Sequence, residues 1–372
     1  MVRRLAVVAF LLAAALSASL FWAQPSAVHE GPRYAEAAES DHGRAIAEAR
    51  SIIYSRMDEF PGLSVAVGIN GTIVWSEGFG WADVEQRVPV RPSSKFRVGS
   101  VAKPMTTALL ALVLQNGAID LDAPVHRYVP SFPEKRFPIT TRQLAGHLAG
   151  IRHYQGNEFL SSRHYPTVSE GLEIFQNDPL LFEPGTQYSY SSYGYNLISA
   201  VIEGATGEDF LTQMADRVFE PLGMRHTSAD QNRLIVFDRV RPYGVDDEGR
   251  FVNAPHVDNS YKWAGGGFVS TTEDLVRFGF GHLEPGFLEA STLAVFQSSQ
   301  KTRDGEETGY GLGWRAGTDD EGRRIVGHGG GSVGGTTSLR LYPDERLVIA
   351  IVTNLSRAPT LPVGEIAELF LE

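Results

Sequence analysis

The chain has 372 residues, no cysteine, and 44 acidic against 33 basic residues, which gives a net charge of −11. The missing thiols exclude disulfides, cysteine nucleophiles, cysteine-ligated zinc and iron–sulfur clusters. The acidic balance argues against a nucleic-acid partner, because general nucleic-acid binding needs a basic face. This length approaches the size limit of one compact core, and therefore predicts either two lobes or one large domain with a cleft.

The first residues have the pattern of a targeting segment. Arg3 and Arg4 precede an apolar run over 5–23, which Pro25 ends. This pattern indicates a cleaved signal peptide or, as the alternative, a retained membrane anchor. We therefore predict a signal peptide or anchor over 1–23, a polar linker over 24–40 and one folded domain over 41–372. The protein is expected to be exported, periplasmic or secreted, with inner-membrane anchoring through residues 5–23 as the alternative.

Strands are predicted near both ends of the chain. A helical pattern over 40–60 precedes two β-rich runs, 63–69 and 72–75, which Asn70-Gly71 joins as a strong hairpin signal. Further strands are expected at 311–314, 324–326, 337–341 and 347–354, followed by a last helix at 363–371.

The middle of the chain is richer in helical patterns, such as those over 105–114, 197–203 and 209–218. Hairpin-linked strands pair antiparallel. We therefore predict an α+β fold, with an antiparallel sheet of five or more strands built from both chain ends and flanked by helices. A mostly helical lobe is inserted, and a cleft is expected between the sheet and this lobe.

Ser100 and Lys103 form a Ser-x-x-Lys motif at the start of an apolar helical run. Three residues make one helical turn, so the two side chains share a face. A serine hydroxyl needs a neighbour that takes its proton, and a lysine can do this only when burial or adjacent positive charge keeps it neutral. Pro104 fits if it falls in the first turn. The motif alone is also typical of an ordinary helix N-cap.

Other patterns are interpreted as structural. Ser298 and Lys301 repeat the motif in a polar stretch, which predicts a surface position. Ser332 lies in Gly-x-Ser-x-Gly, but no histidine follows it, as a nucleophile elbow requires. The Gly-x-Gly within 309–314 precedes no helix, and the ten histidines show no metal-binding spacing. We expect neither a cofactor nor a metal.

Two more segments have a structural and a functional interpretation. The run Tyr188-Ser-Tyr-Ser-Ser-Tyr-Gly-Tyr leads into a helix, which is ordinarily a helix start with packed tyrosines. The run from His328 to Ser332 opens a strand and is either a flexible glycine turn or a strand edge that a substrate can approach closely.

In order and spacing, these segments resemble the serine β-lactamase and penicillin-binding protein superfamily, in its class C-like branch. The run 96–104 is similar to its first motif, Tyr190-Ser191-Ser192 stands where the family has Tyr-x-Asn, and His328-Gly329-Gly330 where it has Lys/His-x-Gly. The resemblance covers about 45–370, with supporting stretches at 141–151, 183–186, 220–224 and 265–274. The segments 138–142 and 150–154 are most similar to mitochondrial serine β-lactamase-like proteases and their bacterial relatives.

The resemblance implies that Ser100 attacks a carbonyl to form an acyl-enzyme and that Lys103 accepts or relays its proton. Tyr190, which a nearby ammonium would favour as a phenolate, would serve the leaving group and later activate water. The oxyanion would rest on the N–H groups of Ser100 and Gly331. The substrate-binding and oxyanion positions are thus expected to be Ser192, His328, Gly330 and Gly331.

Two departures from the family pattern weaken the case for penicillin hydrolysis. Ser192 lacks the side-chain amide of the family's Asn, and His328 lacks the permanent charge of a lysine. We expect an exported serine hydrolase that cleaves an amide (peptide) or ester bond in a small-molecule or peptide substrate through acyl-Ser100. The alternatives are a β-lactamase or D,D-carboxypeptidase, and a non-catalytic binding or sensor module. His153 is interpreted as a packed or surface histidine rather than a pocket residue.

Overall fold

The structure, a computed structural model, describes residues 34–35 and 42–371. The predicted targeting segment over 1–23 lies outside the described residues. Within the predicted linker, the strand β1 (Tyr34–Ala35) pairs antiparallel with Gly78 and Glu77, so these two residues belong to the sheet. Among the described helices, none is long and apolar enough to cross a membrane.

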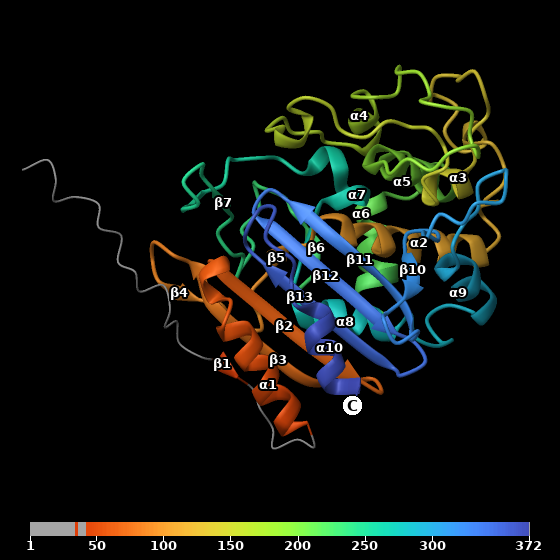
Figure 1. Cartoon of the computed structure of the whole chain (residues 1–372). Coiled ribbons are helices and arrows are strands. Elements are labelled where there is room, and N and C mark those ends of the chain that lie inside the picture. The colour runs from red at the N-terminus through yellow and green to blue at the C-terminus, as the bar shows by residue number, and fades with distance from the viewer. Residues whose placement is uncertain (1–33, 36–41, 372) are drawn as a thin grey trace, which may run out of the picture.

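One antiparallel sheet joins the two ends of the chain, as predicted (Figure 1). Its central pair is β2 (Gly62–Ile69) and β13 (Leu347–Thr353), which run from Ile69 beside Leu347 to Leu63 beside Thr353. The strand order is β1, β3 (Thr72–Asp83), β2, β13, β12 (Gly335–Tyr342), β11 (Arg324–Ser332) and β10 (Arg315–Thr318), and β4 (Val88–Pro89) pairs with β3.

Helices cover both faces of this sheet (Figure 1). The terminal helices α1 (Gly43–Tyr54) and α10 (Val363–Leu371) contact each other over one face, while α8 (Thr272–Phe280) packs on the other. Neighbouring residues alternate between the two cores, because successive strand side chains point to opposite faces. Val65 therefore packs in the core under α1 and α10, and Ala66 in the core shared with the lobe.

The inserted lobe lies above the sheet in Figure 1. Its central helix is α2 (Ala102–Gln115), which is buried on nearly all sides, as the apolar run of its sequence predicts. Around it lie α3 (Thr141–Ala145), α4 (Val168–Leu172), α5 (Ser192–Thr206), α6 (Phe210–Met214), α7 (Trp263–Gly266) and α9 (Ala290–Gln297). Short strands complete it: β5 (Phe96–Arg97), β6 (Ser228–Ala229) and β9 (Phe268–Ser270) in one sheet, and β7 (Tyr243–Val245) with β8 (Phe251–Asn253) in another.

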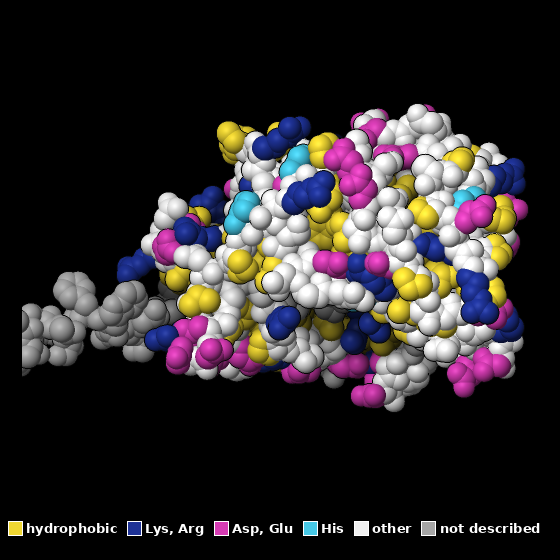
Figure 2. Space-filling model, turned by 90° about the horizontal axis from the view of Figure 1, so that it is seen from above, with side chains coloured by type: hydrophobic (Ala, Val, Ile, Leu, Met, Phe, Trp, Pro, Cys, Tyr) yellow, Lys and Arg dark blue, Asp and Glu magenta, His cyan; other side chains and the backbone are white. Residues whose placement is uncertain are grey.

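Most predicted elements are present, and one prediction is wrong. Asn70 and Gly71 both have positive φ, as the hairpin between β2 and β3 requires. The expected strand over 311–314 is instead a bend, and β10 begins only at Arg315. The cause is Gly313, whose φ of 93° is outside the strand region and whose Cα lies tightly against Thr107 of α2. Acidic and basic side chains are interspersed on the face drawn in Figure 2.

Glycines let β11 approach the turn that carries Ser100 and leads into α2. A Cβ on Gly330 would lie 2.0 Å from the carbonyl oxygen of Val98, and a Cβ on Gly99 would lie 2.6 Å from that of Gly331. Gly99 also has a φ of 52°, which disfavours other residues. The sheet edge and the short 3₁₀ turn over Gly99–Val101 therefore meet backbone to backbone.

We predict that Gly330→Ala forces this edge away from Ser100. The added methyl should destabilise the protein by about 1–3 kcal/mol, the usual cost of overpacking, and slow any reaction at Ser100. Gly329→Ala is the matched control, because its Cβ would have no neighbour closer than 3.9 Å. Chemical denaturation of both variants measures the effect, and equal stabilities would contradict the close approach.

Candidate active site

Ser100 lies where the predictions placed it, at the start of the central helix of the lobe. It belongs to the 3₁₀ turn Gly99–Val101, which runs directly into α2. Pro104 falls in the first turn of α2, where its missing N–H costs little. Lys103 follows one turn after Ser100, and its Nζ lies 3.0 Å from the Ser100 Oγ. The motif therefore forms a contact as well as a sequence pattern.

Lys103 is completely buried and has three polar partners. Besides Ser100, its Nζ lies 2.9 Å from the Ser192 Oγ and 2.7 Å from the carbonyl oxygen of Gly265 in α7. A neutral amine has two N–H donors and one lone pair. The neutral Lys103 amine can therefore donate hydrogen bonds to Gly265 and Ser192 and accept one from the hydroxyl of Ser100. All three contacts are then satisfied.

The surroundings favour this neutral form of Lys103. Burial lowers the pKa of the Lys103 amine well below its usual value of 10.5, and the positive charge of Lys262 acts in the same direction. No carboxylate of the described residues forms an ion pair with Lys103. This chain thus supplies the condition on which the sequence argument depended, a lysine that can act as a base towards Ser100.

Tyr190 lies in the segment just before α5, with its ring centroid 4.8 Å from the Lys103 Nζ. We expected a nearby ammonium to favour the phenolate, but the structure points the other way. Burial raises the pKa of the Tyr190 phenol, and hydrogen bonding with Ser100 and the charge of Arg315 offset this only in part. Because Lys103 itself tends to be neutral, Tyr190 remains a phenol that can donate a proton.

Two histidines hold the segment that carries Tyr190 and Ser192. The N–H of Ser191 donates to the Nδ1 of His147 at 3.1 Å, and the N–H of Ser192 donates to the Nδ1 of His153 at 3.2 Å. His147 adopts a φ of 60°, unusual for a residue other than glycine. Its ring packs 4.3 Å from that of Tyr190, so this backbone conformation positions the tyrosine.

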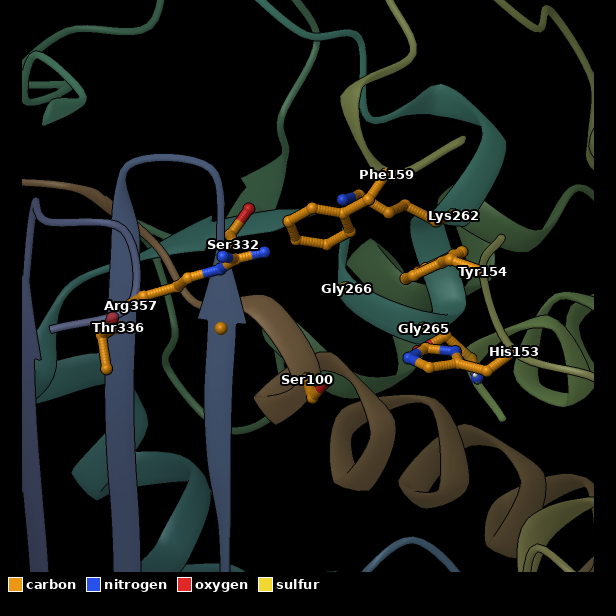
Figure 3. Close-up of a pocket in the computed structure, with 12 residues that line it drawn as sticks. Ser100, His153, Tyr154, Phe159, Lys262, Gly265, Gly266, Ser332, Thr336 and Arg357 are labelled. Carbon is orange, nitrogen blue, oxygen red and sulfur yellow. Dashed lines mark hydrogen bonds between the residues drawn. The ribbon is translucent and has the colours of Figure 1, made fainter. Parts of the chain in front are cut away.

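His153 is a pocket residue, and the interpretation of it as a packed or surface histidine is wrong. Its side chain lines the cavity that contains Ser100 (Figure 3). Burial, together with the charges of Lys103 and Lys262, lowers the pKa of His153 to about 4. Since Nδ1 accepts a hydrogen bond, the proton of this neutral ring is on Nε2. His153 thus offers the kind of donor that Ser192, in place of asparagine, cannot provide.

His328 is buried on β11 and does not line the cavity around Ser100. Its Nδ1 donates to the carbonyl oxygen of Gly329 at 2.6 Å, and its Nε2 accepts from the hydroxyl of Tyr310 at 2.9 Å. Burial lowers the pKa of His328 to about 3. Both ring nitrogens are occupied and the ring is neutral, so the expected pocket-lining role of His328 is not what this geometry shows.

Gly330 and Gly331 have different surroundings on the same strand. Gly330 faces the backbone of Val98 and Ser100 and leaves no room for a side chain. Gly331 lines the cavity, and a Cβ there would meet nothing within 4 Å. The strand β10 pairs with β11 only as far as Gly327, so beyond that residue this edge of β11 faces the turn that carries Ser100.

A cavity of about 410 Å³ opens beside Ser100 (Figure 3). This is a common size for a small-molecule site. Its lining residues come from both lobe and sheet: Ser100, His153, Tyr154, Phe159, Ser192, Lys262, Gly265, Gly266, Gly331, Ser332, Thr336 and Arg357. The predicted cleft between the sheet and the lobe is therefore present, and Ser100 lines it.

Several of these residues were missed by the sequence analysis. Lys262 and Arg357 are cations that match no motif, and Tyr154 and Phe159 come from a loop whose course the sequence does not predict. One available signal was the scarcity of lysine: the chain has five, and Lys262 immediately precedes the apolar run Trp263-Ala264-Gly265.

Two of the candidates that were interpreted as structural, the second Ser-x-x-Lys motif and Ser332, are so. Lys301 is exposed and pairs with Glu307, which confirms the surface position of the second Ser-x-x-Lys. Ser332 is followed by a tight turn and β12 instead of a helix, so it is no nucleophile elbow. Among the described residues, one carboxylate cluster could hold a metal ion: Asp319, Glu321 and Glu368. The guanidinium of Arg323 pairs with all three and occupies the place of a cation.

Comparison with known proteins identifies the family and the fold. The model of the Beta-lactamase family matches residues 49–369. The chain belongs to this family. Its members are serine hydrolases of the β-lactamase fold. The human mitochondrial serine beta-lactamase-like protein LACTB is 32% identical, over 81% of this chain and 73% of the relative.

Two further relatives extend the comparison. Penicillin-binding protein 4* of Bacillus subtilis is 28% identical over 78% of this chain and 67% of its own length. The octameric penicillin-binding protein homologue from Pyrococcus abyssi superposes with a TM-score of 0.75 at 25% identity, covering 88% of this chain and 76% of that one. The predicted resemblance and fold class are confirmed.

We predict that phosphonylation of Ser100 by a fluorophosphonate probe depends on the neutral Lys103 amine. The labelling rate should rise with pH as Lys103 loses its proton, and it should level off well below pH 10.5, because the pKa is lowered. Lys103→Met should slow labelling by about 10²–10⁴-fold, the usual worth of general base catalysis, and abolish this pH dependence. Lys301→Met, from the surface motif, is the control. An unchanged pH profile in Lys103→Met would contradict the assignment.

Proposed function

We propose that this protein is a serine hydrolase that cleaves an amide (peptide) or ester bond through an acyl-enzyme on Ser100. The observation that carries the proposal is the fully buried Lys103 amine 3.0 Å from the hydroxyl of Ser100, a residue that lines a cavity of substrate size. A non-catalytic binding module would have no use for a buried lysine held against a serine.

The proposed reaction begins with transfer of the Ser100 hydroxyl proton to Lys103 as the Ser100 Oγ attacks the carbonyl carbon of the substrate. The N–H groups of Ser100 and Gly331 stabilise the oxyanion, and the missing side chain at Gly331 leaves that strand edge open. The Tyr190 phenol then donates its proton to the leaving group and recovers one from Lys103. A second acyl transfer of the same kind follows. In it, water replaces the Ser100 hydroxyl as the attacking group, and the Ser100 Oγ replaces the substrate's leaving group.

The substrate is proposed to be a small molecule or peptide with a scissile carbonyl. Efficient β-lactam hydrolysis is not favoured, because Ser192 lacks the amide of the family pattern and the buried, neutral His328 offers no charge to a β-lactam carboxylate. Amide and ester hydrolysis needs neither group.

We predict that a fluorophosphonate probe labels the wild-type protein and that Ser100→Ala abolishes the labelling. Ser298→Ala, from the surface Ser-x-x-Lys, should label at the wild-type rate, because Ser298 is exposed and is not a hydrogen-bond partner of Lys103. Gel fluorescence and intact-mass analysis measure the adduct. Absence of labelling in the wild type, or equal labelling of Ser100→Ala, would contradict the proposal. Efficient turnover of nitrocefin would instead identify a β-lactamase.

The protein is further proposed to act outside the cytoplasm. Support comes from the charged residues Arg3 and Arg4 followed by the apolar run over 5–23. Fractionation of cells that express the full chain should recover it in the periplasm or medium, with a new N-terminus, found by sequencing, after the apolar run. An intact N-terminus in the membrane fraction would indicate the anchor instead. Recovery of intact protein in the cytoplasm would contradict export.

A further inference from the structure

Lys262 is buried among aromatic rings at one wall of the active-site cavity. It ends the 3₁₀ turn Ser260–Lys262 and is 1% exposed. Its Nζ lies 4.1 Å from the ring centroid of Phe159, 5.3 Å from that of Tyr261 and 5.7 Å from that of Tyr154. Figure 3 shows its side chain extending beside Phe159 at the cavity.

The ammonium of Lys262 has no hydrogen-bond acceptor and no carboxylate partner within the described parts of the chain. The other fully buried lysine, Lys103, has three polar partners. The acidic group that acts on the pKa of Lys262 is Asp230. Its carboxylate already binds Arg97, Arg239 and Asn259. Burial therefore lowers the pKa of Lys262 to about 7, with the charge of Arg97 acting in the same direction. Contacts with ring faces repay only part of this desolvation.

The position of Lys262 relative to the nucleophile suggests which part of a substrate it meets. Lys262 and Ser100 line the same cavity, whereas Tyr190, the proposed donor to the leaving group, does not. The cavity is therefore on the acyl side of the scissile bond. Ser332 also lines this cavity, and its buried hydroxyl has no hydrogen-bond partner among the described residues. The cavity thus has two polar groups that a ligand could bind.

We propose that Lys262 is a specificity-determining residue that binds a carboxylate on the acyl portion of the substrate. This inference rests on the proposed acyl transfer to Ser100 and names its substrate class: esters or amides of dicarboxylic acids, or of acyl groups with a comparable terminal anion. A bound carboxylate would form an ion pair with the buried ammonium, which pairs with no carboxylate of the described residues. Such an ion pair is strong in a site that excludes water. Lys262 would attract the anion locally, although the net charge of −11 repels anions from the protein as a whole.

The test compares two esters of equal length, mono-p-nitrophenyl glutarate and p-nitrophenyl pentanoate, which differ in a terminal carboxylate. The wild-type protein should prefer the glutarate in kcat/KM. Lys262→Met keeps the length of the side chain and removes its charge. It should lower kcat/KM for the glutarate by about 10–100-fold more than for the pentanoate, the worth of a hydrogen bond to a charged group, mainly through KM. Any effect through the pKa of Lys103 changes both esters equally. An equal loss with both esters would overturn the proposal, as would a wild-type preference for the pentanoate.

Arg357, an exposed cation that lines the same cavity, supplies the matched control. Arg357→Met should leave the preference for the glutarate largely intact, and loss of that preference in Arg357→Met alone would overturn the role of Lys262. The charge of Lys262 also helps to lower the pKa of Lys103, so labelling is compared at high pH, where Lys103 is neutral in both proteins. Fluorophosphonate labelling of Lys262→Met at the wild-type rate under that condition shows that the fold and Ser100 are intact.

A binding measurement separates this proposal from the hydrolase proposal. Calorimetry with glutarate on Ser100→Ala requires no turnover. Binding to Ser100→Ala that is lost in Ser100→Ala/Lys262→Met supports the anion site even if neither ester is hydrolysed. Equal binding by both proteins, or binding by neither, overturns it.

Discussion

The burial of the Lys103 amine against Ser100 is the constraint on which the site depends. An exposed lysine would be charged and useless as a base, so the surrounding structure must exclude water and avoid offering a carboxylate. The helix α2 provides this by being buried on nearly all sides, and α5 and α7 each contribute one polar partner, Ser192 and the carbonyl of Gly265. The lobe thus holds the Lys103 amine beside the Ser100 hydroxyl, in surroundings that favour the neutral form of the amine.

The sheet contributes an open strand edge beside Ser100, which the lobe does not provide. Pairing of β2 with β13 brings the chain ends together and fixes where β11 lies. Glycine at 99 and 330 allows backbone contact between that strand and the turn carrying Ser100, and glycine at 331 keeps the cavity open. Two basic side chains, Lys262 and Arg357, line the wall of the same cavity.

Short sequence patterns predicted the features that depend only on residues close together in the chain. The hairpin at Asn70-Gly71 follows from backbone preferences, and the contact between Ser100 and Lys103 follows from one helical turn. Contacts between distant segments were not predictable in this way. Lys262 reaches the cavity from a 3₁₀ turn and His153 from a loop. The bend at Gly313 depends on Thr107, and one hydrogen bond of His328 depends on Tyr310. Each of these depends on a residue far away in the sequence.

The charge state of Lys103 is the central claim, and nitrogen-15 NMR of a lysine-labelled sample measures it directly. The chain has only five lysines, so the side-chain spectrum is small, and Lys103→Met assigns the signal. We predict that the Lys103 nitrogen acquires the chemical shift of a neutral amine well below the usual lysine pKa of about 10.4. A Lys103 signal with the shift of an ammonium ion up to about pH 10 would contradict the account.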